Sequence, residues 1–103
     1  MSAIRQVRLR HVVISGRVQG VGYRAWTQYT ALDHDVEGWV RNRRDGCVEA
    51  VFAGAPEAVS RMIEACRRGP PGACVDAVDE RDGTNDELAL RRHGERFSVL
   101  STA

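Results

Sequence analysis

The dipeptide Asp45-Gly46 lies between two apolar runs, and it constrains the fold of this chain more than any other feature. Asp-Gly between apolar stretches is a strong signal for a tight β-hairpin, because the turn needs positive φ angles that glycine adopts freely. The flanking segments, 36–42 and 47–53, contain Val, Trp and Phe at short intervals. We therefore expect two neighbouring antiparallel strands in the middle of the chain.

Two segments before the hairpin are predicted to form a strand and a helix. Residues 7–15 are rich in Val, Leu and Ile and stop at a glycine, which is typical of a strand. Between about residues 23 and 33, the apolar positions Ala25, Tyr29 and Leu32 recur at i, i+4 and i+7, which is helical spacing. The glycines between these two segments indicate a loop.

The rest of the chain predicts a second helix and two more strands. Pro56 suits the first turn of the helix, and an apolar stripe follows at i, i+3, i+4 and i+7, made of Val59, Met62, Ile63 and Cys66. Gly69-Pro70-Pro71-Gly72 ends this helix. Strands are expected at 73–80 and 97–100, with a polar turn at 82–86 between them.

The predicted order is β-α-β-β-α-β, with a weak extra strand or loop near the end. This order is that of the ferredoxin-like α+β sandwich, in which an antiparallel sheet carries both helices on one face. A chain of 103 residues can bury one core but is too short for two. Residues 1–103 are therefore expected to form a single domain.

Charge and cysteine content argue against several classes of protein. The net charge of +1 is unlike that of a generally basic nucleic-acid-binding protein, and no stretch approaches membrane-spanning length. Cys47, Cys66 and Cys74 are odd in number and form no CxxC pair, so we expect buried free thiols in a reducing, cytoplasmic compartment. The three histidines lack the spacing of metal ligands, so no metal site is predicted.

The loop from Gly16 to Arg24 is a candidate binding site for a phosphate-sized anion. It joins a buried strand to a helix whose first N–H groups have no internal partners, and its glycines let those groups converge. All fifteen basic residues are arginine, so an anion site must use arginine or backbone N–H groups. The alternative is that the glycines only make a turn and that Arg24 is a solvated surface residue.

Two other phosphate-binding motifs are excluded. Residues 20–25 fit the dinucleotide-binding fingerprint formally, but that motif needs a parallel βαβ unit, whereas here a hairpin follows the helix. The P-loop pattern fails as well, because no Lys-Ser or Lys-Thr pair follows the glycines. We therefore reject both nucleotide-binding interpretations of this loop.

Asn42 is the second candidate site residue, at the end of the strand before the hairpin turn. An asparagine at this place commonly serves the turn. Its amide can also accept a hydrogen bond from a water proton and donate one to an oxygen, so it can hold a water in line for attack.

Several sequence blocks form one larger pattern: Gly16-x-Val18-Gln19-Gly20-Val21-Gly22-Tyr23-Arg24, Gly38-Trp39-Val40-x-Asn42 and Asp45-Gly46-x-Val48-Glu49, extended by Gly69-Pro70-Pro71-Gly72-Ala73-x-Val75 and Phe97. In these blocks the chain resembles the acylphosphatase family. The first two blocks at this separation are highly specific together, and the similarity covers nearly the whole chain. The fold of that family is the same βαββαβ sandwich.

The resemblance implies an activity and a set of site residues. Arg24 matches the arginine that binds the phosphoryl group together with loop amides of residues 19–24, among them those of Gln19, Gly20, Val21, Gly22 and Tyr23. Asn42 matches the asparagine that positions the attacking water. The implied reaction is hydrolysis of a small-molecule acyl phosphate to a carboxylate and inorganic phosphate, by a monomer, with no metal or cofactor.

The chain departs from the family pattern at the end of the first helix. Most relatives have a Leu-Gly-Leu-like stretch there, and this chain has His34, Asp35 and Val36. Asp tolerates a left-handed helix cap less well than Gly, so we expect lost stability or a reshaped helix end. Two alternatives stay open: a non-catalytic anion-binding or regulatory module, and an acylphosphatase-like domain of a larger maturation enzyme, which the chain length argues against.

Overall fold

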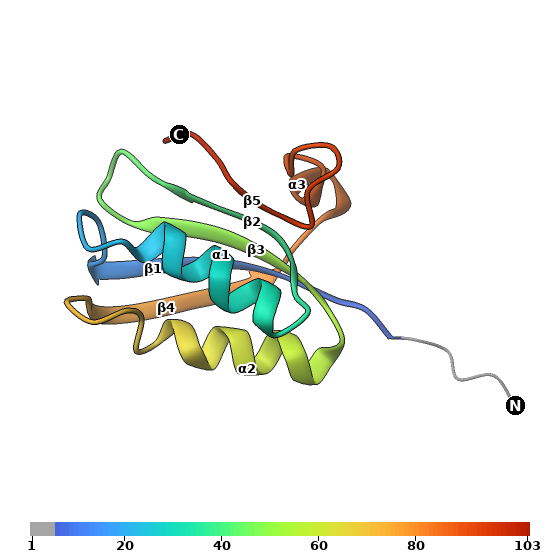
Figure 1. The fold of residues 1–103 in the computed structure, drawn as a ribbon, viewed down its shortest axis with the longest axis horizontal. Helices are drawn as coiled ribbons and strands as arrows, with labels where there is room; N and C mark the ends of the chain where they lie inside the picture. The colour runs from blue at the N-terminus through green and yellow to red at the C-terminus, as the bar shows by residue number, and fades with distance from the viewer. Residues whose placement is uncertain (1–5) are drawn as a thin grey trace, which may run out of the picture.

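The computed structural model describes residues 6–103, which form five strands and three helices (Figure 1). In chain order these are β1 (Arg8–Arg17), α1 (Tyr23–Asp33), β2 (Glu37–Asn42), β3 (Val48–Gly54), α2 (Pro56–Cys66), β4 (Cys74–Asp82), α3 (Asn85–Leu88) and β5 (Phe97–Val99). The predicted order of strands and helices is confirmed. One element differs, because the short helix α3 forms at residues 85–88, where the sequence predicted the end of a polar turn and then a weak extra strand or loop.

The five strands form one sheet in the order β4-β1-β3-β2-β5. The β1–β3, β1–β4 and β2–β3 pairs are antiparallel, as expected, and the hairpin pairs Asn42 with Val48. The fifth strand differs from the expected antiparallel sheet, since β5 pairs with β2 in parallel, with Gly38 opposite Phe97. The difference arises because the chain crosses from the β4 edge to the opposite edge before it enters β5.

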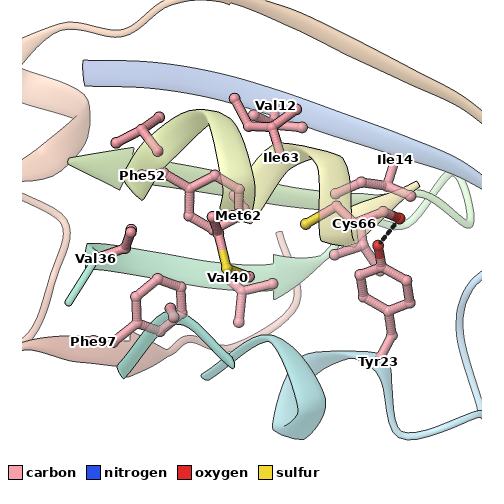
Figure 2. Packing of buried hydrophobic residues seen from close by; sticks show 14 of the residues in the cluster. Val12, Ile14, Tyr23, Val36, Val40, Phe52, Met62, Ile63, Cys66 and Phe97 are labelled. Atoms are coloured by element: carbon pink, nitrogen blue, oxygen red, sulfur yellow. Dashed lines mark hydrogen bonds between the residues drawn. The ribbon is translucent and has the colours of Figure 1, made fainter. Parts of the chain in front are cut away.

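Helices α1 and α2 cover one face of the sheet, and the core lies between them and the strands (Figure 1). The predicted stripe of α2 is confirmed: Val59, Met62, Ile63 and Cys66 are all buried. Figure 2 shows Met62 and Cys66 among side chains of the sheet, with Phe52 and Phe97 close to Met62. These two phenylalanine rings stack at a centroid distance of 6.1 Å.

Helix α1 turns a different face to the core from the one that its apolar spacing suggested. The buried residues are Tyr23, Thr27 and Ala31, whereas Tyr29 is 78% exposed and Leu32 is 41% exposed. The buried polar groups are satisfied within the protein: Tyr23 Oη donates to the Cys66 carbonyl at 2.6 Å (Figure 2), and the Thr27 hydroxyl donates to the Tyr23 carbonyl at 2.7 Å. Tyr23 and Thr27 can therefore face the core, because their hydroxyl groups form hydrogen bonds within the protein.

The other face of the sheet is partly covered by α3. Its capping box joins Thr84 and Glu87, and the Trp39 indole donates to the Glu87 carbonyl at 2.7 Å, so that Trp39 is only 1% exposed. On the same sheet, Glu49 accepts hydrogen bonds from Arg41 at 2.7 Å and lies 2.7 Å from His11 Nε2. Burial alone would raise the pKa of Glu49, but these two partners outweigh it and leave the pKa below its ordinary value.

The residue after the C-terminal cap of α1 adopts the conformation on which the expected loss of stability depends, and that loss stays a prediction. Asp35 has a φ of 58°, which is the left-handed conformation that glycine adopts at least cost. His34, the residue before it, is partly exposed. The cysteines depart from expectation, because only Cys66 is buried and Cys74 is exposed. Within residues 6–103, no helix is both long enough and apolar enough to cross a membrane.

Candidate active site

The loop between β1 and α1 is built on glycines with positive φ angles. A Cβ at Gly16 would collide with the Cys74 carbonyl on β4, and the β1–β4 register shifts at this point. Gly20 and Gly22 have φ angles of 74° and 79°, and Gly22 caps α1 in the left-handed conformation. Because side-chain-bearing residues rarely adopt such angles, the glycines allow the loop to curl in front of the helix.

The curled loop presents a row of backbone N–H groups. The first backbone hydrogen bond of α1 runs from the Trp26 N–H to the Gly22 carbonyl at 3.1 Å. Within the part of the chain that the structure describes, no N–H of residues 19–25 donates to a protein acceptor. These donors lie at the positive end of the α1 dipole, and together they favour an anion.

Gln19 fixes this loop to the β2–β3 hairpin. Its side-chain nitrogen donates to the Arg43 carbonyl at 2.8 Å and to the Cys47 carbonyl at 2.9 Å. The hairpin turn is itself braced, because the Cys47 N–H donates to Asp45 at 3.0 Å and Arg43 pairs with Asp45 at 2.7 Å. The Cys47 backbone and the Arg43 guanidinium hold the pKa of Asp45 below its ordinary value.

A cavity of about 320 Å³ brings most of the predicted site residues together. Its lining contains both proposed catalytic residues and most of the predicted loop, and it consists of Val18, Gln19, Gly20, Gly22, Tyr23, Arg24, Ala25, Gln28, Asn42 and Val99. Val21 is the predicted loop residue that does not line the cavity; its side chain packs against the core. The Tyr23 side chain also points into the core, so its backbone is the part available to an anion.

Arg24 and Asn42 keep their side-chain polar groups available. Among residues 6–103, neither side chain forms a hydrogen bond within the protein, and no carboxylate lies within 4.0 Å of the Arg24 guanidinium. The Asn42 backbone is held on both sides, by pairing with Val48 on β3 and by the Ala103 N–H, which donates to the Asn42 carbonyl at 3.1 Å. Asn42 therefore has a fixed backbone and a side-chain amide without a protein partner among residues 6–103, which suits it to binding a ligand or a water.

Three lining residues were not predicted as site residues: Ala25, Gln28 and Val99. Gln28 lies one helical turn after Arg24, and its side-chain nitrogen donates to the Phe97 carbonyl at 3.0 Å. The i, i+4 spacing from Arg24 was a signal that could have identified it. Val99 reaches the cavity because β5 pairs with β2, a long-range contact that the local sequence does not indicate.

The chemistry of the lining is that of an anion site without a strong base. Arg24 is the one charged residue among the ten that line the cavity, and none of them is Asp, Glu or His. Within residues 6–103, no three His, Cys, Asp or Glu side chains lie close enough together to hold a metal ion. The arrangement can bind a tetrahedral anion through N–H groups and a guanidinium while an amide holds a neighbouring water.

Comparison with known proteins gives one consistent result. The sequence model of the family described as Acylphosphatase matches residues 10–98. The chain is 61% identical over 94 residues to an acylphosphatase of Rhodopseudomonas palustris, covering 91% of this chain and 95% of that protein. It is 62% identical over 91 residues to an acylphosphatase of Bradyrhizobium diazoefficiens, covering 88% and 92%.

The fold agrees with the sequence comparison. The crystal structure of acylphosphatase from Bacillus subtilis superposes with a TM-score of 0.78 at 31% identity, covering 92% of this chain and 99% of that chain. The ferredoxin-like α+β fold expected from the order of strands and helices is therefore confirmed. On the sequence match, the shared fold and the identity to its relatives, this chain belongs to the acylphosphatase family.

Proposed function

We propose that this chain hydrolyses the carboxyl–phosphate bond of acyl phosphates and releases a carboxylate and inorganic phosphate. Membership of the acylphosphatase family supports this reaction. The observation that carries the assignment of roles is the shared cavity, where a loop of unpaired N–H groups, the Arg24 guanidinium and the Asn42 amide meet.

The phosphoryl group is the part of the substrate that the loop binds. Backbone N–H groups of residues 19–24 donate to its non-bridging oxygens, and Arg24 adds a planar pair of donors with a full positive charge. In a loose phosphoryl-transfer transition state, charge is spread over these same oxygens. Catalysis at this site then consists mainly of positioning and of charge stabilisation by donors that are already in place.

Asn42 holds the attacking water. Its amide oxygen accepts a hydrogen bond from the water, and its N–H₂ group donates to a phosphoryl oxygen, so that the water is aligned with phosphorus. The water oxygen bonds to phosphorus, and the bond from phosphorus to the acyl oxygen breaks with its electron pair leaving on the carboxylate. Because a carboxylate is a good leaving group, the reaction does not need a strong general acid or base, in keeping with the residues that line the cavity.

The test is phosphate release from acetyl phosphate by the wild-type protein and by Arg24→Ala and Asn42→Ala. Each variant removes one transition-state contact, so each should lose about 100- to 1,000-fold in kcat, equivalent to about 2.7–4 kcal/mol of barrier. Matched controls are Arg68→Ala and Asn85→Ala, which change exposed residues outside the cavity and should keep near-wild-type turnover. Wild-type turnover should persist in the presence of a chelator.

The same assay separates the enzyme from a non-catalytic anion-binding module. A binding module would bind inorganic phosphate and lose that binding in Arg24→Ala, yet it would not release phosphate faster than the spontaneous background. Turnover that survives both Arg24→Ala and Asn42→Ala would contradict the roles proposed for these two residues.

A further inference from the structure

The cavity has a wall that the phosphate-binding loop does not provide. This wall is formed by Ala25 and Gln28 from α1 and by Val99 from β5. A volume of about 320 Å³ corresponds to roughly ten water molecules at about 30 Å³ each, which is more than one phosphoryl group and one attacking water occupy. Space is therefore left for another part of the substrate.

The place of this wall relative to Arg24 follows from the helix. Ala25 is the next residue after Arg24, and Gln28 lies on the same side of α1, one turn or about 5.4 Å further along the helix axis. A phosphoryl group held at Arg24 and at the first N–H groups of α1 therefore lies about one helical turn from Gln28, so a substituent on that group can reach Ala25 and Gln28. Val99 lines the cavity from β5, which is an edge strand of the sheet.

The Gln28 amide is oriented by the protein. Its nitrogen donates one hydrogen to the Phe97 carbonyl at 3.0 Å, and because a carbonyl can only accept, this contact identifies the nitrogen end of the amide. A primary amide has a second hydrogen on the same nitrogen. Gln28 lines the cavity, and among residues 6–103 its side-chain nitrogen forms only the bond to Phe97, so the second hydrogen can serve an acceptor on the ligand.

The charge of this wall restricts what it can hold. Among the described residues that line the cavity, Arg24 is the only charged one, and the phosphoryl group uses it. A second anionic group on the substrate would lose water against Ala25 and Val99 without gaining a cation, which is unfavourable. An uncharged alkyl or aryl group has no charge to desolvate, and it gains free energy from contact with the apolar side chains.

We propose that Ala25, Gln28 and Val99 form an acyl subsite that selects uncharged acyl groups, with Gln28 donating to the acyl carbonyl oxygen. The proposal rests on the proposed function, because it concerns the other end of the same substrate. It makes Gln28 a residue that contacts the substrate, and it makes Ala25 and Val99 determinants of acyl specificity.

The test compares kcat/KM for acetyl, butanoyl and benzoyl phosphate with that for the anionic 3-carboxypropanoyl phosphate. Wild type should prefer butanoyl over 3-carboxypropanoyl phosphate by on the order of 10-fold. Ala25→Arg places a cation at the subsite and should reduce or invert this preference. Tyr29→Arg is the matched control, because it adds the same cation one turn further along α1, at a residue 78% exposed and outside the cavity lining.

Two further measurements separate the acyl end from the phosphate end. Gln28→Met should lower kcat/KM for every acyl phosphate by about 3- to 10-fold, the effect expected from one uncharged hydrogen bond. The inhibition constant of inorganic phosphate should stay within 2-fold of wild type in Gln28→Met and Ala25→Arg, because phosphate has no acyl group.

The outcomes distinguish this proposal from the one it rests on. Equal kcat/KM for butanoyl and 3-carboxypropanoyl phosphate, or the same change of preference in Tyr29→Arg as in Ala25→Arg, would overturn the acyl subsite while leaving hydrolysis intact. Failure to hydrolyse any of the four substrates would overturn the proposed function and the subsite together.

Discussion

The side-chain nitrogen of Gln19 lies 2.8 Å from the carbonyl oxygen of Arg43, the residue that follows Asn42. A second hydrogen bond from the same nitrogen reaches Cys47 at 2.9 Å, so one amide joins the β1–α1 loop to both ends of the hairpin turn. The loop carries the proposed phosphate-binding N–H groups, and the hairpin carries Asn42. Gln19 therefore sets the position of the proposed water-holding residue relative to the phosphoryl group.

Replacing Gln19 should impair catalysis more than it impairs folding. Gln19→Leu removes both hydrogen bonds, and we expect a loss of about 1–2 kcal/mol in the free energy of unfolding, measured by urea denaturation. Because small displacements of reacting groups are costly, kcat should fall by up to about 100-fold. Gln6→Leu changes an exposed glutamine and serves as the control. A Gln19→Leu enzyme with wild-type kcat would contradict the coupling of loop and hairpin.

We expect Tyr23 to contribute to stability through its hydroxyl group and to the proposed site only through its backbone. The hydroxyl donates to the Cys66 carbonyl at 2.6 Å in the core, and burial raises the pKa of Tyr23 well above its ordinary value. Tyr23→Phe leaves that carbonyl without its side-chain partner and should reduce the free energy of unfolding by about 1–2 kcal/mol. Tyr29→Phe alters an exposed hydroxyl and should stay within about 0.5 kcal/mol. The kcat of Tyr23→Phe at 25 °C should be within 3-fold of wild type, and a larger loss would assign the hydroxyl a role in the site.

Asp35→Gly should stabilise the protein. Asp35 adopts a φ of 58°, where glycine carries no steric penalty, and its only ion pair within residues 6–103 is an exposed contact with Arg96 at 3.5 Å. The gain should be about 1 kcal/mol in the free energy of unfolding, because relief of a steric penalty of about 1–2 kcal/mol is partly offset by the larger entropy that glycine loses on folding. Asp35→Asn, which removes the charge but keeps a residue that tolerates this conformation, should be close to neutral. A destabilised Asp35→Gly variant would show that the Arg96 contact outweighs the strain.

Glu87 should make the stability of the protein depend on acid pH. Hydrogen bonds from Arg81 and the Thr84 N–H lower the pKa of Glu87 to about 2, from an ordinary value of 4.5. A lowered pKa stabilises the folded protein above pH 4.5, and this contribution is lost as the pH falls towards 2. Because Arg81 is 54% exposed, solvent screens the pair and the contribution at pH 7 is about 1 kcal/mol. Unfolding free energies of wild type and Glu87→Gln should differ at pH 7 and converge near pH 2; a constant difference would contradict the linkage.

The parts of the fold that were predictable are those fixed by local chemistry. Asp45-Gly46 specifies its hairpin, and the stripe from Val59 to Cys66 faces the core because every member is apolar. The short helix α3 also has a local signal, since Thr84 and Glu87 have capping-box spacing. That signal lies in a polar segment without an apolar stripe, and the segment was therefore interpreted as a turn.

The parts that were not predictable depend on contacts between distant segments. Tyr23 and Thr27 face the core because Cys66 and the helix backbone satisfy their hydroxyl groups, which apolar spacing cannot indicate. The candidate site also has parts that the local sequence indicates and parts that depend on distant contacts. The loop and Asn42 were recognisable as motifs, whereas Val99 enters the cavity only through the parallel pairing of β5 with β2.

The central claim is that a water held by Asn42 attacks the phosphorus of an acyl phosphate bound at Arg24. The most direct measurement is hydrolysis of acetyl phosphate by the wild-type protein in ¹⁸O-labelled water, with the label located by mass spectrometry. The account predicts one ¹⁸O atom in inorganic phosphate and none in acetate, because the bond broken is between phosphorus and the acyl oxygen. Label in acetate would mean attack at the carbonyl carbon, and it would contradict the account.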